Sequence, residues 1–333
     1  MKAIFLTNSV GNIARVYASE TLERICGMID AEQAEYTKDD VMKDPEKFRD
    51  VQFIFSTWGM PVFTEEEIAE VFPKLEAIFY AAGTVQAFAR PFLHRGVKIF
   101  SAWIANAVPV AEYTVAQIIL ANKGYFLRSN LMSNGVVTRA REMAQYYPGN
   151  YDAAIGIIGT GAIGRFVCDM LKPYRLRVLA YSRSLTEEKA KALGVEKSDI
   201  ETIFRTCHVV SNHLANNAQT VGMLTKAHFA SMRPYATFLN TGRGAQVDEN
   251  GMIEVLKERQ DLTAVLDVTY PEPPVEGSPL YTLPNCILTP HIAGSAGNEV
   301  HRMAEWMAEE FCRYANGEAC QYEVTEEMLK TMA

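Results

Sequence analysis

The 333-residue sequence lacks a surplus of positive charge: Asp and Glu outnumber Lys and Arg by 40 to 32, and the formal net charge is −8. Proteins that bind the phosphate backbone of nucleic acids depend on a basic surplus. Hydrophobic residues make up 48% of the chain and charged residues 22%, which is typical of a globular protein. The composition therefore predicts no nucleic-acid partner.

Paired cysteines and long apolar runs are also missing. The six cysteines form no CxxC pair and no zinc-type His/Cys spacing, so we expect reduced, buried thiols and no metal site. The apolar run near the N-terminus is too short for a signal peptide, and no later stretch approaches the ~18 apolar residues of a membrane span. These absences predict a cytoplasmic protein with no membrane partner.

Short β-rich segments alternate with helical patterns along most of the chain. The first series begins at "KAIFLT" (2–7), and Thr64 with Glu67 forms a capping-box pattern that marks a helix start. A long helical pattern follows residue 106, and a second series begins at "AAIGIIG" (153–159). Alternation of this kind predicts two α/β units with parallel sheets.

The second series ends near residue 290, and a single long helix is expected after it. Too little chain remains for a further domain, so we expect this helix to return to the first unit. The sequence thus predicts two Rossmann-like, doubly wound domains. A dinucleotide-binding domain, residues 105–290, is inserted into a flavodoxin-like substrate domain formed by residues 1–104 and 291–333.

A glycine-rich turn, "GTGAIG", lies between an apolar strand and a helix. In a dinucleotide-binding unit the first glycine allows the sharp turn, the second lets a pyrophosphate approach the backbone, and the third lets helix and strand pack closely. This context makes the motif specific. The candidate cofactor-binding residues are Gly159, Thr160, Gly161, Ala162, Ile163 and Gly164.

The next strand, "RVLAYS", ends where such units usually carry an acid that binds a ribose hydroxyl. Here the sequence reads Ser182, Arg183 and Ser184. An acid would repel a 2′-phosphate, whereas an arginine between two hydroxyls can bind one. The stretch therefore favours NADP(H), with NAD(H) possible; the alternative is an ordinary solvated loop.

Three later segments place polar side chains after predicted strands, at the edge where open α/β sheets bind ligands. "NTGRGAQVD" contains Arg243 between two glycines, "DVTYPEP" contains Glu272 before a proline that restricts its backbone, and "TPHIAGS" contains His291. An arginine, a carboxylate and a histidine are the groups needed to hold an anionic substrate and move a proton.

The order of these motifs resembles the D-isomer-specific 2-hydroxyacid dehydrogenase family over nearly the whole chain. The resemblance implies that Arg243 binds the carboxylate of a 2-oxo acid and polarises its keto oxygen. It implies that His291 is the general acid or base, and that Glu272 holds its ring and favours the protonated form. Asp267 resembles the family acid near the nicotinamide, with a structural role as the alternative, and Thr241 is a further candidate cofactor-binding residue.

The stretch "YAAGTVQAF" departs from the family pattern. The family usually has a GxGxD pattern here, but this chain keeps only Gly83 and has Val85 in place of the acid. The backbone N–H groups of Ala82, Gly83 and Thr84 could still bind a substrate carboxylate. The substrate of the best-known members therefore does not transfer directly.

The sequence predicts a reductase of glyoxylate-like or hydroxypyruvate-like 2-oxo acids that uses a nicotinamide dinucleotide. A formate dehydrogenase is disfavoured, because those relatives pair the histidine with glutamine rather than with an acid such as Glu272. The alternative from another class is a dinucleotide-sensing, corepressor-like binding protein of the same fold. The resemblance also implies a homodimer formed through the dinucleotide-binding domain.

Overall fold

The computed structural model describes residues 1–330, and every element, sheet and contact given below refers to that part of the chain. The chain divides into two compact units, which are described separately. Unit 1 contains Met1–Asn106 and the chain from Ser295 onward, and unit 2 contains Ala107–Gly294. The assignment of substrate and cofactor binding to the two domains predicted above stays a prediction.

Unit 1 is built on a six-stranded sheet in the order β13-β5-β4-β3-β1-β2. Five strands are parallel, and β13 pairs antiparallel with β5 at one edge. The order β2-β1-β3-β4-β5 is that of flavodoxin-like sheets. The strands are β1 (Lys2–Leu6), β2 (Asp30–Tyr36), β3 (Phe53–Ser56), β4 (Ala77–Tyr80), β5 (Lys98–Ser101) and β13 (Glu323–Val324).

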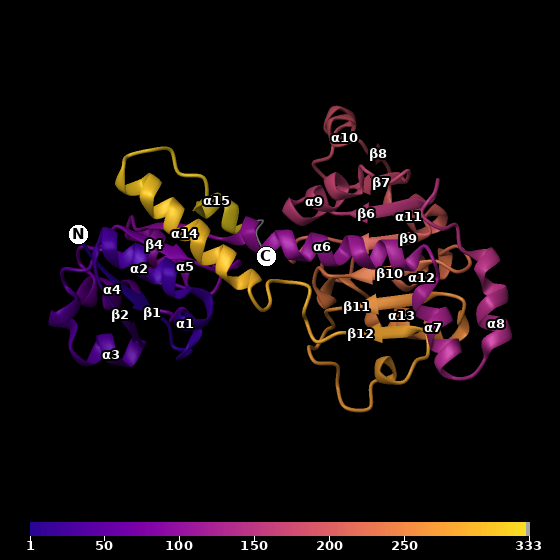
Figure 1. The fold of residues 1–333 in the computed structure, drawn as a ribbon, viewed down its shortest axis with the longest axis horizontal. Helices are drawn as coiled ribbons and strands as arrows, with labels where there is room; N and C mark the ends of the chain where they lie inside the picture. The colour runs from indigo at the N-terminus through magenta and orange to yellow at the C-terminus, as the bar shows by residue number, and fades with distance from the viewer. Residues whose placement is uncertain (331–333) are drawn as a thin grey trace. The chain divides into compact units, whose positions relative to one another are not determined.

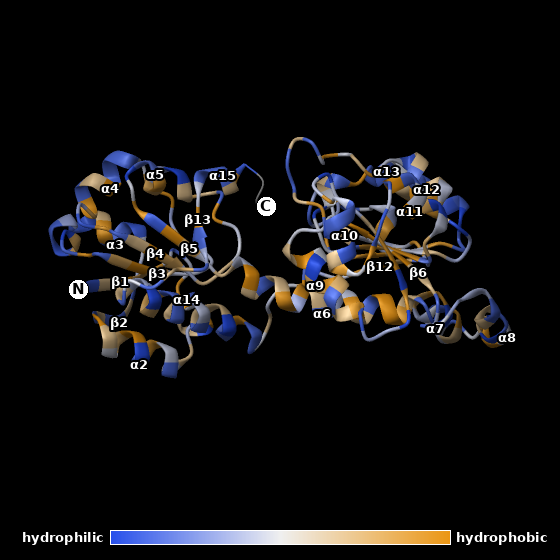
Figure 2. Ribbon diagram, turned by 90° about the horizontal axis from the view of Figure 1, so that it is seen from above, coloured by the Kyte–Doolittle hydropathy of each residue, from blue (hydrophilic) through white to orange (hydrophobic). Residues whose placement is uncertain are grey.

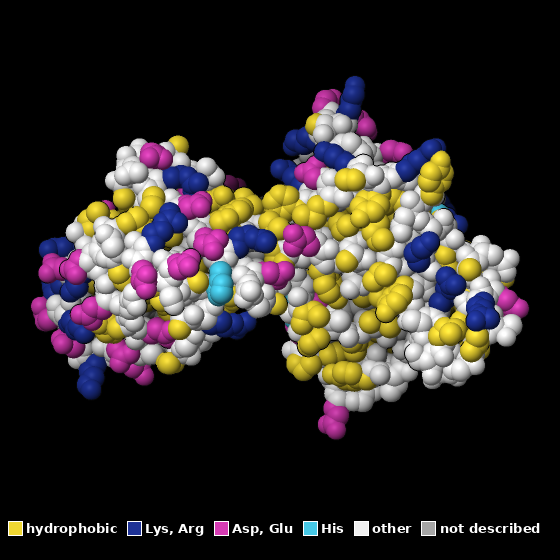
Figure 3. All heavy atoms as spheres, viewed as in Figure 1, with side chains coloured by type: hydrophobic (Ala, Val, Ile, Leu, Met, Phe, Trp, Pro, Cys, Tyr) yellow, Lys and Arg dark blue, Asp and Glu magenta, His cyan; other side chains and the backbone are white. Residues whose placement is uncertain are grey.

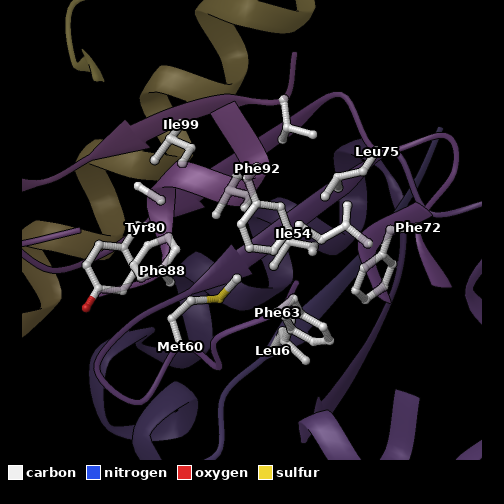
Figure 4. Close-up of a cluster of buried hydrophobic side chains, with 14 of the residues drawn as sticks. Leu6, Ile54, Met60, Phe63, Phe72, Leu75, Tyr80, Phe88, Phe92 and Ile99 are labelled. Atoms are coloured by element: carbon white, nitrogen blue, oxygen red, sulfur yellow. The ribbon is translucent and has the colours of Figure 1, made fainter. Parts of the chain in front are cut away.

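Helices cover both faces of this sheet (Figure 1). One face packs against α3 (Lys38–Lys43), α4 (Glu65–Val71) and α5 (Ala89–His94), and Figure 4 shows the aliphatic and aromatic side chains buried there. The other face packs against α1 (Asn12–Val16), α2 (Ser19–Met28) and α14 (Glu299–Ala315). The turn η1 (Pro45–Phe48) and the terminal helix α15 (Glu326–Leu329) complete the unit.

The capping box predicted at the start of α4 is present. The backbone N–H of Glu67 donates to Thr64 Oγ1 at 3.3 Å, and that of Thr64 donates to Glu67 Oε2 at 2.8 Å. The segment from Asn12 to Met28 forms two helices, α1 and α2, because the extended Tyr17 interrupts it. Its buried hydroxyl donates to the carbonyl of Ser56 at 3.0 Å.

Unit 2 has a seven-stranded parallel sheet in the order β12-β11-β10-β9-β6-β7-β8. The order reverses between β6 and β9, which is the arrangement of a Rossmann sheet. The strands are β6 (Ala154–Ile158), β7 (Arg177–Tyr181), β8 (Glu196–Lys197), β9 (Val209–Asn212), β10 (Thr237–Asn240), β11 (Thr263–Leu266) and β12 (Cys286–Leu288). Two doubly wound α/β units with mainly parallel sheets are thus confirmed.

Both faces of the unit 2 sheet are covered by helices, and its strands are among the most hydrophobic segments (Figure 2). On one side lie α11 (Ile200–Thr206), α12 (Lys226–Ser231) and α13 (Glu249–Glu258). On the other lie α6 (Trp103–Ala121), α9 (Ala162–Leu171) and α10 (Glu187–Leu193). The remaining elements are α7 (Tyr125–Ser133), α8 (Val137–Glu142), η2 (Met143–Tyr146), η3 (Gly244–Gln246) and η4 (Pro279–Tyr281).

The helix α6 corrects one expectation. It is long and apolar enough to cross a membrane by length and composition alone, with a mean hydropathy of 1.4. The expectation that no stretch approaches a membrane span was therefore too strong. Its residues Ala111, Ile118 and Ala121 belong to the buried core of unit 2, and core helices pass the same test.

The cysteines differ in how far they are buried. All six cysteines are free, but only Cys168 and Cys207 are buried, so the expectation of buried thiols holds for two of them. Figure 3 shows acidic and basic side chains interspersed on the visible face of each unit.

Candidate active site

The sheet of unit 2 brings the three predicted catalytic residues to one edge. Arg243 follows β10, Glu272 follows β11 and His291 follows β12, and these strands are parallel neighbours. The carboxyl ends of parallel strands meet at the same edge of a sheet, where ligands bind in open α/β folds. Unit 2 alone therefore presents an arginine, a carboxylate and a histidine at one edge of its sheet.

Glu272 and His291 are in direct contact. Nδ1 of His291 lies 2.7 Å from Oε1 of Glu272, and the side chains are 46% and 39% exposed. An ionised carboxylate can only accept a hydrogen bond, so Nδ1–H donates in this contact. Nε2 is then the ring nitrogen left to exchange a proton with a ligand.

The backbone of His291 has a left-handed conformation, with φ at 54°. Such a value is uncommon for a residue with a side chain and persists where the surroundings enforce it. The N–H of His291 donates to the carbonyl of Asp267 at 3.1 Å. The bond attaches the histidine segment to the end of β11.

The carboxylate of Asp267 makes three further bonds to the same segment. It accepts from Thr289 Oγ1 at 2.6 Å, from the N–H of Ile292 at 2.8 Å and from the N–H of Ala293 at 2.9 Å. Tyr113 Oη lies 3.2 Å from the same Thr289 hydroxyl. Asp267 is buried, so its contacts favour the structural alternative: it holds the loop of His291 rather than reaching a ligand.

The Arg243 loop is shaped by the two glycines that flank it. A Cβ on Gly244 would lie 2.0 Å from the carbonyl carbon of Thr269, and one on Gly242 would lie 2.9 Å from Gln246 Oε1. Both glycines are thus needed for the close packing of the Arg243 loop. Nη1 of Arg243 donates to the carbonyl of Gly242 at 2.7 Å. Within residues 1–330, no hydrogen bond or ion pair joins Arg243 to Glu272 or His291.

The glycine turn after β6 fits a dinucleotide pyrophosphate. Gly159 has φ at 97°, and a Cβ there would lie 2.5 Å from the carbonyl oxygen of His213. A Cβ on Gly164 would lie 2.0 Å from the carbonyl oxygen of Gly159, so helix α9 packs closely on the turn. A Cβ on Gly161, the N-cap of α9, would meet nothing within 4 Å. The second glycine therefore leaves the open approach to the backbone that a phosphate needs.

Two basic residues, Arg165 beside this turn and Lys189 beside the loop after β7, were not singled out from the sequence. Nε of Arg165 donates to the carbonyl of Thr160 at 3.1 Å, which places a cation beside the turn. Nζ of Lys189, in α10, donates to the carbonyl of Ser184 at 3.2 Å. The signal for both was a basic residue in the first turns of the helix after each strand. Arg183 is exposed in the same loop as Ser184.

The remaining candidate cofactor residues are Ser182, Thr241, Ala162 and Ile163. Oγ of Ser182 and of Ser184 lie 3.5 Å apart. Thr241 is buried, and its hydroxyl lies 3.3 Å from that of Thr114 and 3.5 Å from Nδ1 of His213. Ala162 and Ile163, in the first turn of α9, are partly exposed.

The predicted substrate loop lies in unit 1, after β4. The N–H of Ala82 already donates to the carbonyl of Tyr80 at 2.9 Å, so Ala82 is not a free donor. The N–H groups of Gly83 and Thr84 have no partner among the described residues. Oγ of Ser101 donates to the carbonyls of Ala82 at 2.9 Å and Gly83 at 2.6 Å, which fixes this loop.

Comparison with known proteins agrees with this geometry. The family model described as "D-isomer specific 2-hydroxyacid dehydrogenase, NAD binding domain" matches residues 115–293, more than half of the chain. The chain belongs to the D-isomer-specific 2-hydroxyacid dehydrogenase family. It is accordingly an oxidoreductase that uses a nicotinamide dinucleotide.

Relatives of this dehydrogenase carry names for several substrates. A glyoxylate reductase of Korarchaeum cryptofilum is 28% identical over 292 residues, which cover 86% of each chain. A D-3-phosphoglycerate dehydrogenase of Archaeoglobus fulgidus is 29% identical over 67% of this chain, which spans only 42% of that protein. The apo D-mandelate dehydrogenase of Rhodotorula graminis has the same fold, with a TM-score of 0.81, 18% identity and 98% coverage of both chains.

Proposed function

We propose that this dehydrogenase reduces a small 2-oxo acid to the D-2-hydroxy acid, with glyoxylate and hydroxypyruvate as the first candidates. The observation that carries the proposal is the 2.7 Å contact between His291 and Glu272 at the sheet edge that also bears Arg243. The glyoxylate reductase name of a relative that aligns over 86% of both chains supports the choice of candidates.

Each of the three side chains has a distinct task in the proposed reaction. Nε2 of His291 donates a proton to the keto oxygen, while Glu272 holds the opposite side of the ring. Arg243 pairs with the substrate carboxylate through its planar guanidinium, a geometry that lysine cannot reproduce. The nicotinamide, when bound, supplies the hydride.

Unit 1 offers its own anion-binding group. The free N–H donors of Gly83 and Thr84 lie at the carboxyl end of β4, on a loop that Ser101 holds from its carbonyl side. Adjacent backbone N–H groups of this kind can bind a carboxylate. Val85 stands where the family usually has an acid, and its side chain is buried in the core.

For the cofactor, we propose a preference for NADPH over NADH. The loop between β7 and α10 carries no acid; Arg183 precedes Ser184 in it, and Lys189 of α10 donates to the Ser184 carbonyl. Two cations and two hydroxyls suit a 2′-phosphate.

We also propose a homodimer that forms through unit 2. Large hydrophobic side chains are exposed on one continuous segment of this unit, and a hollow of about 350 Å³ lies among them. The exposed residues of this segment are Leu120, Tyr125, Met132, Val136, Val137 and Tyr146. Replacing Met132 by Glu should convert a dimer into a monomer in light scattering. A wild-type monomer would contradict this part of the proposal.

The test of the reaction is a panel of 2-oxo acids assayed with NADPH and NADH, including glyoxylate, hydroxypyruvate, pyruvate and branched and aromatic acids. The variant His291→Ala should lose about 10²- to 10⁴-fold in kcat while it still binds NADPH. If no acid is turned over although NADPH binds and changes the affinity for a protein partner, the corepressor-like alternative is correct instead.

A further inference from the structure

Three buried amide side chains form a connected cluster beneath Arg243. They are Asn212 at the end of β9, Asn240 at the end of β10 and Gln246 in η3, and each is at most 1% exposed. Buried amides are costly unless all their polar atoms find partners. We call these three residues the amide cluster.

Asn212 is the centre of the cluster. Its Nδ2 donates to Asn240 Oδ1 at 3.0 Å and to Gln246 Oε1 at 2.5 Å, and its Oδ1 accepts from the N–H of Leu214 at 3.2 Å. Nε2 of Gln246 donates to the carbonyl of Leu214 at 2.6 Å. These bonds fix which end of each amide carries the oxygen.

The cluster holds both backbone polar groups of Arg243. Gln246 Oε1 accepts from the N–H of Arg243 at 3.2 Å, and Asn240 Nδ2 donates to its carbonyl at 3.2 Å. Asn240 Oδ1 also accepts from the N–H of Gly242 at 3.1 Å. Every polar atom of the three amides is thereby used, and the backbone on both sides of the Arg243 side chain is fixed.

From this arrangement we propose that Gln246 is a positioning residue for Arg243. It acts through the backbone and sets where the guanidinium meets the substrate carboxylate. This inference rests on the carboxylate-binding role proposed for Arg243. Hydrogen bonds weaken steeply when donor and acceptor are misaligned, so a buried amide without substrate contact can still affect substrate affinity by setting the position of Arg243.

The test compares Gln246→Met, which keeps the side-chain length but has no amide, with a matched control. Asn285 is also a buried amide of unit 2, and its Nδ2 donates to the carbonyls of Leu256, Arg259 and Leu262. The control Asn285→Leu therefore removes buried hydrogen bonds far from Arg243. Both variants should lose thermal stability, because both lose buried hydrogen bonds. A loss of stability alone would therefore indicate a structural role only.

Only Gln246→Met should change substrate recognition. We expect its KM for glyoxylate and hydroxypyruvate to rise about 10- to 100-fold, with the Kd of NADPH, measured by fluorescence titration, nearly unchanged. In an Arg243→Ala background, Gln246→Met should raise KM little further, because the group it positions is gone. Equal KM values for Gln246→Met and Asn285→Leu, or additive effects in the double variant, would overturn the inference.

The same set of variants separates this inference from the proposed function. If Arg243→Ala keeps its KM for every acid of the panel, the role of Arg243 itself is wrong. If Arg243→Ala loses substrate affinity while Gln246→Met does not, the proposed function stands and only the positioning role fails.

Discussion

Nδ1 of His291 lies 2.7 Å from Oε1 of Glu272, although the two residues are separated by 18 intervening residues and leave different strands of the unit 2 sheet. Neither side chain is buried, so solvent competes for this contact. The contact between His291 and Glu272 therefore depends on how the backbone holds the two loops that carry them. Asp267, at the end of β11, fixes the His291 segment through its carbonyl and its carboxylate.

The contact predicts how substitutions of Glu272 rank. Glu272→Gln keeps an oxygen that can accept from Nδ1 but removes the negative charge, whereas Glu272→Ala removes both. General acid catalysis contributes about 10²- to 10⁴-fold, so we expect Glu272→Ala to lower kcat within that range and Glu272→Gln by less. Steady-state kinetics with the best acid of the panel measure this order. Equal kcat values for wild type and Glu272→Ala would remove Glu272 from the mechanism.

Replacing Asp267 tests whether it holds the His291 loop. In Asp267→Asn one acceptor oxygen becomes an NH₂ group, which then faces backbone donors of Ile292 or Ala293. Leaving a buried donor without its acceptor costs about 1–3 kcal/mol, so both thermal stability and kcat should fall. Thr289→Val, which removes only one bond to Asp267, should show a smaller loss in the same direction. A stable Asp267→Asn protein with normal kcat would show that the loop does not depend on this carboxylate.

The main parts of the fold and site could be predicted because each has a strong local signal. Arg243, Glu272 and His291 all follow short apolar runs, and parallel strands bring such positions to one edge. The glycine turn is equally explicit: Gly159 and Gly164 have no room for a side chain, and Gly161 leaves the approach to the backbone open. Sequence order was therefore enough to predict that these groups lie at one edge of the sheet, while their catalytic roles stay predictions.

Other features have no signal of this kind. The edge strand β2, "DAEQAEY", is polar and partly exposed, so it lacks the apolar pattern that predicts a strand, and the edge strand β8 has only two residues. A carboxylate after a strand looks the same in sequence whether it binds a ligand or backbone N–H groups. The role of Asp267 was for this reason open until its partners were known. Lys189 has only the weak signal of a basic residue early in a helix, and its contact with Ser184 depends on how α10 begins.

The buried His213 predicts a pH dependence of stability. Burial lowers the pKa of His213 to about 3, from an ordinary value of 6.5. Below about pH 6.5 the unfolded chain binds a proton at this residue that the folded protein does not, so stability falls as the pH drops toward 3. In His213→Asn the unfolding free energy should fall less steeply as the pH drops over this range. The difference in slope from wild type corresponds to at most about one bound proton per molecule. Urea titrations from pH 7 to 4 measure both slopes.

His94 provides a control of opposite sign. Its hydrogen bond with Glu65 raises its pKa, so its contribution is present at low pH and is lost as the pH rises through the folded value. The variant His94→Asn should thus differ from wild type below about pH 6.5 and converge with it at higher pH. Identical pH slopes for wild type and His213→Asn would contradict the buried, neutral state of His213.

Arg183 and Lys189 predict the outcome of a cofactor comparison. A hydrogen bond to a charged group contributes about 1.5–3 kcal/mol, so Arg183→Ala should raise the Kd of NADPH about 10- to 100-fold. NADH has no 2′-phosphate, and its Kd should change little.

Lys189→Ala should shift the preference in the same direction, because its ammonium lies within 3.2 Å of the Ser184 carbonyl. Arg165→Ala, beside the glycine turn, should instead weaken both cofactors equally, since both carry the pyrophosphate. Equal losses for NADPH and NADH in Arg183→Ala would mean that the loop after β7 does not select the cofactor.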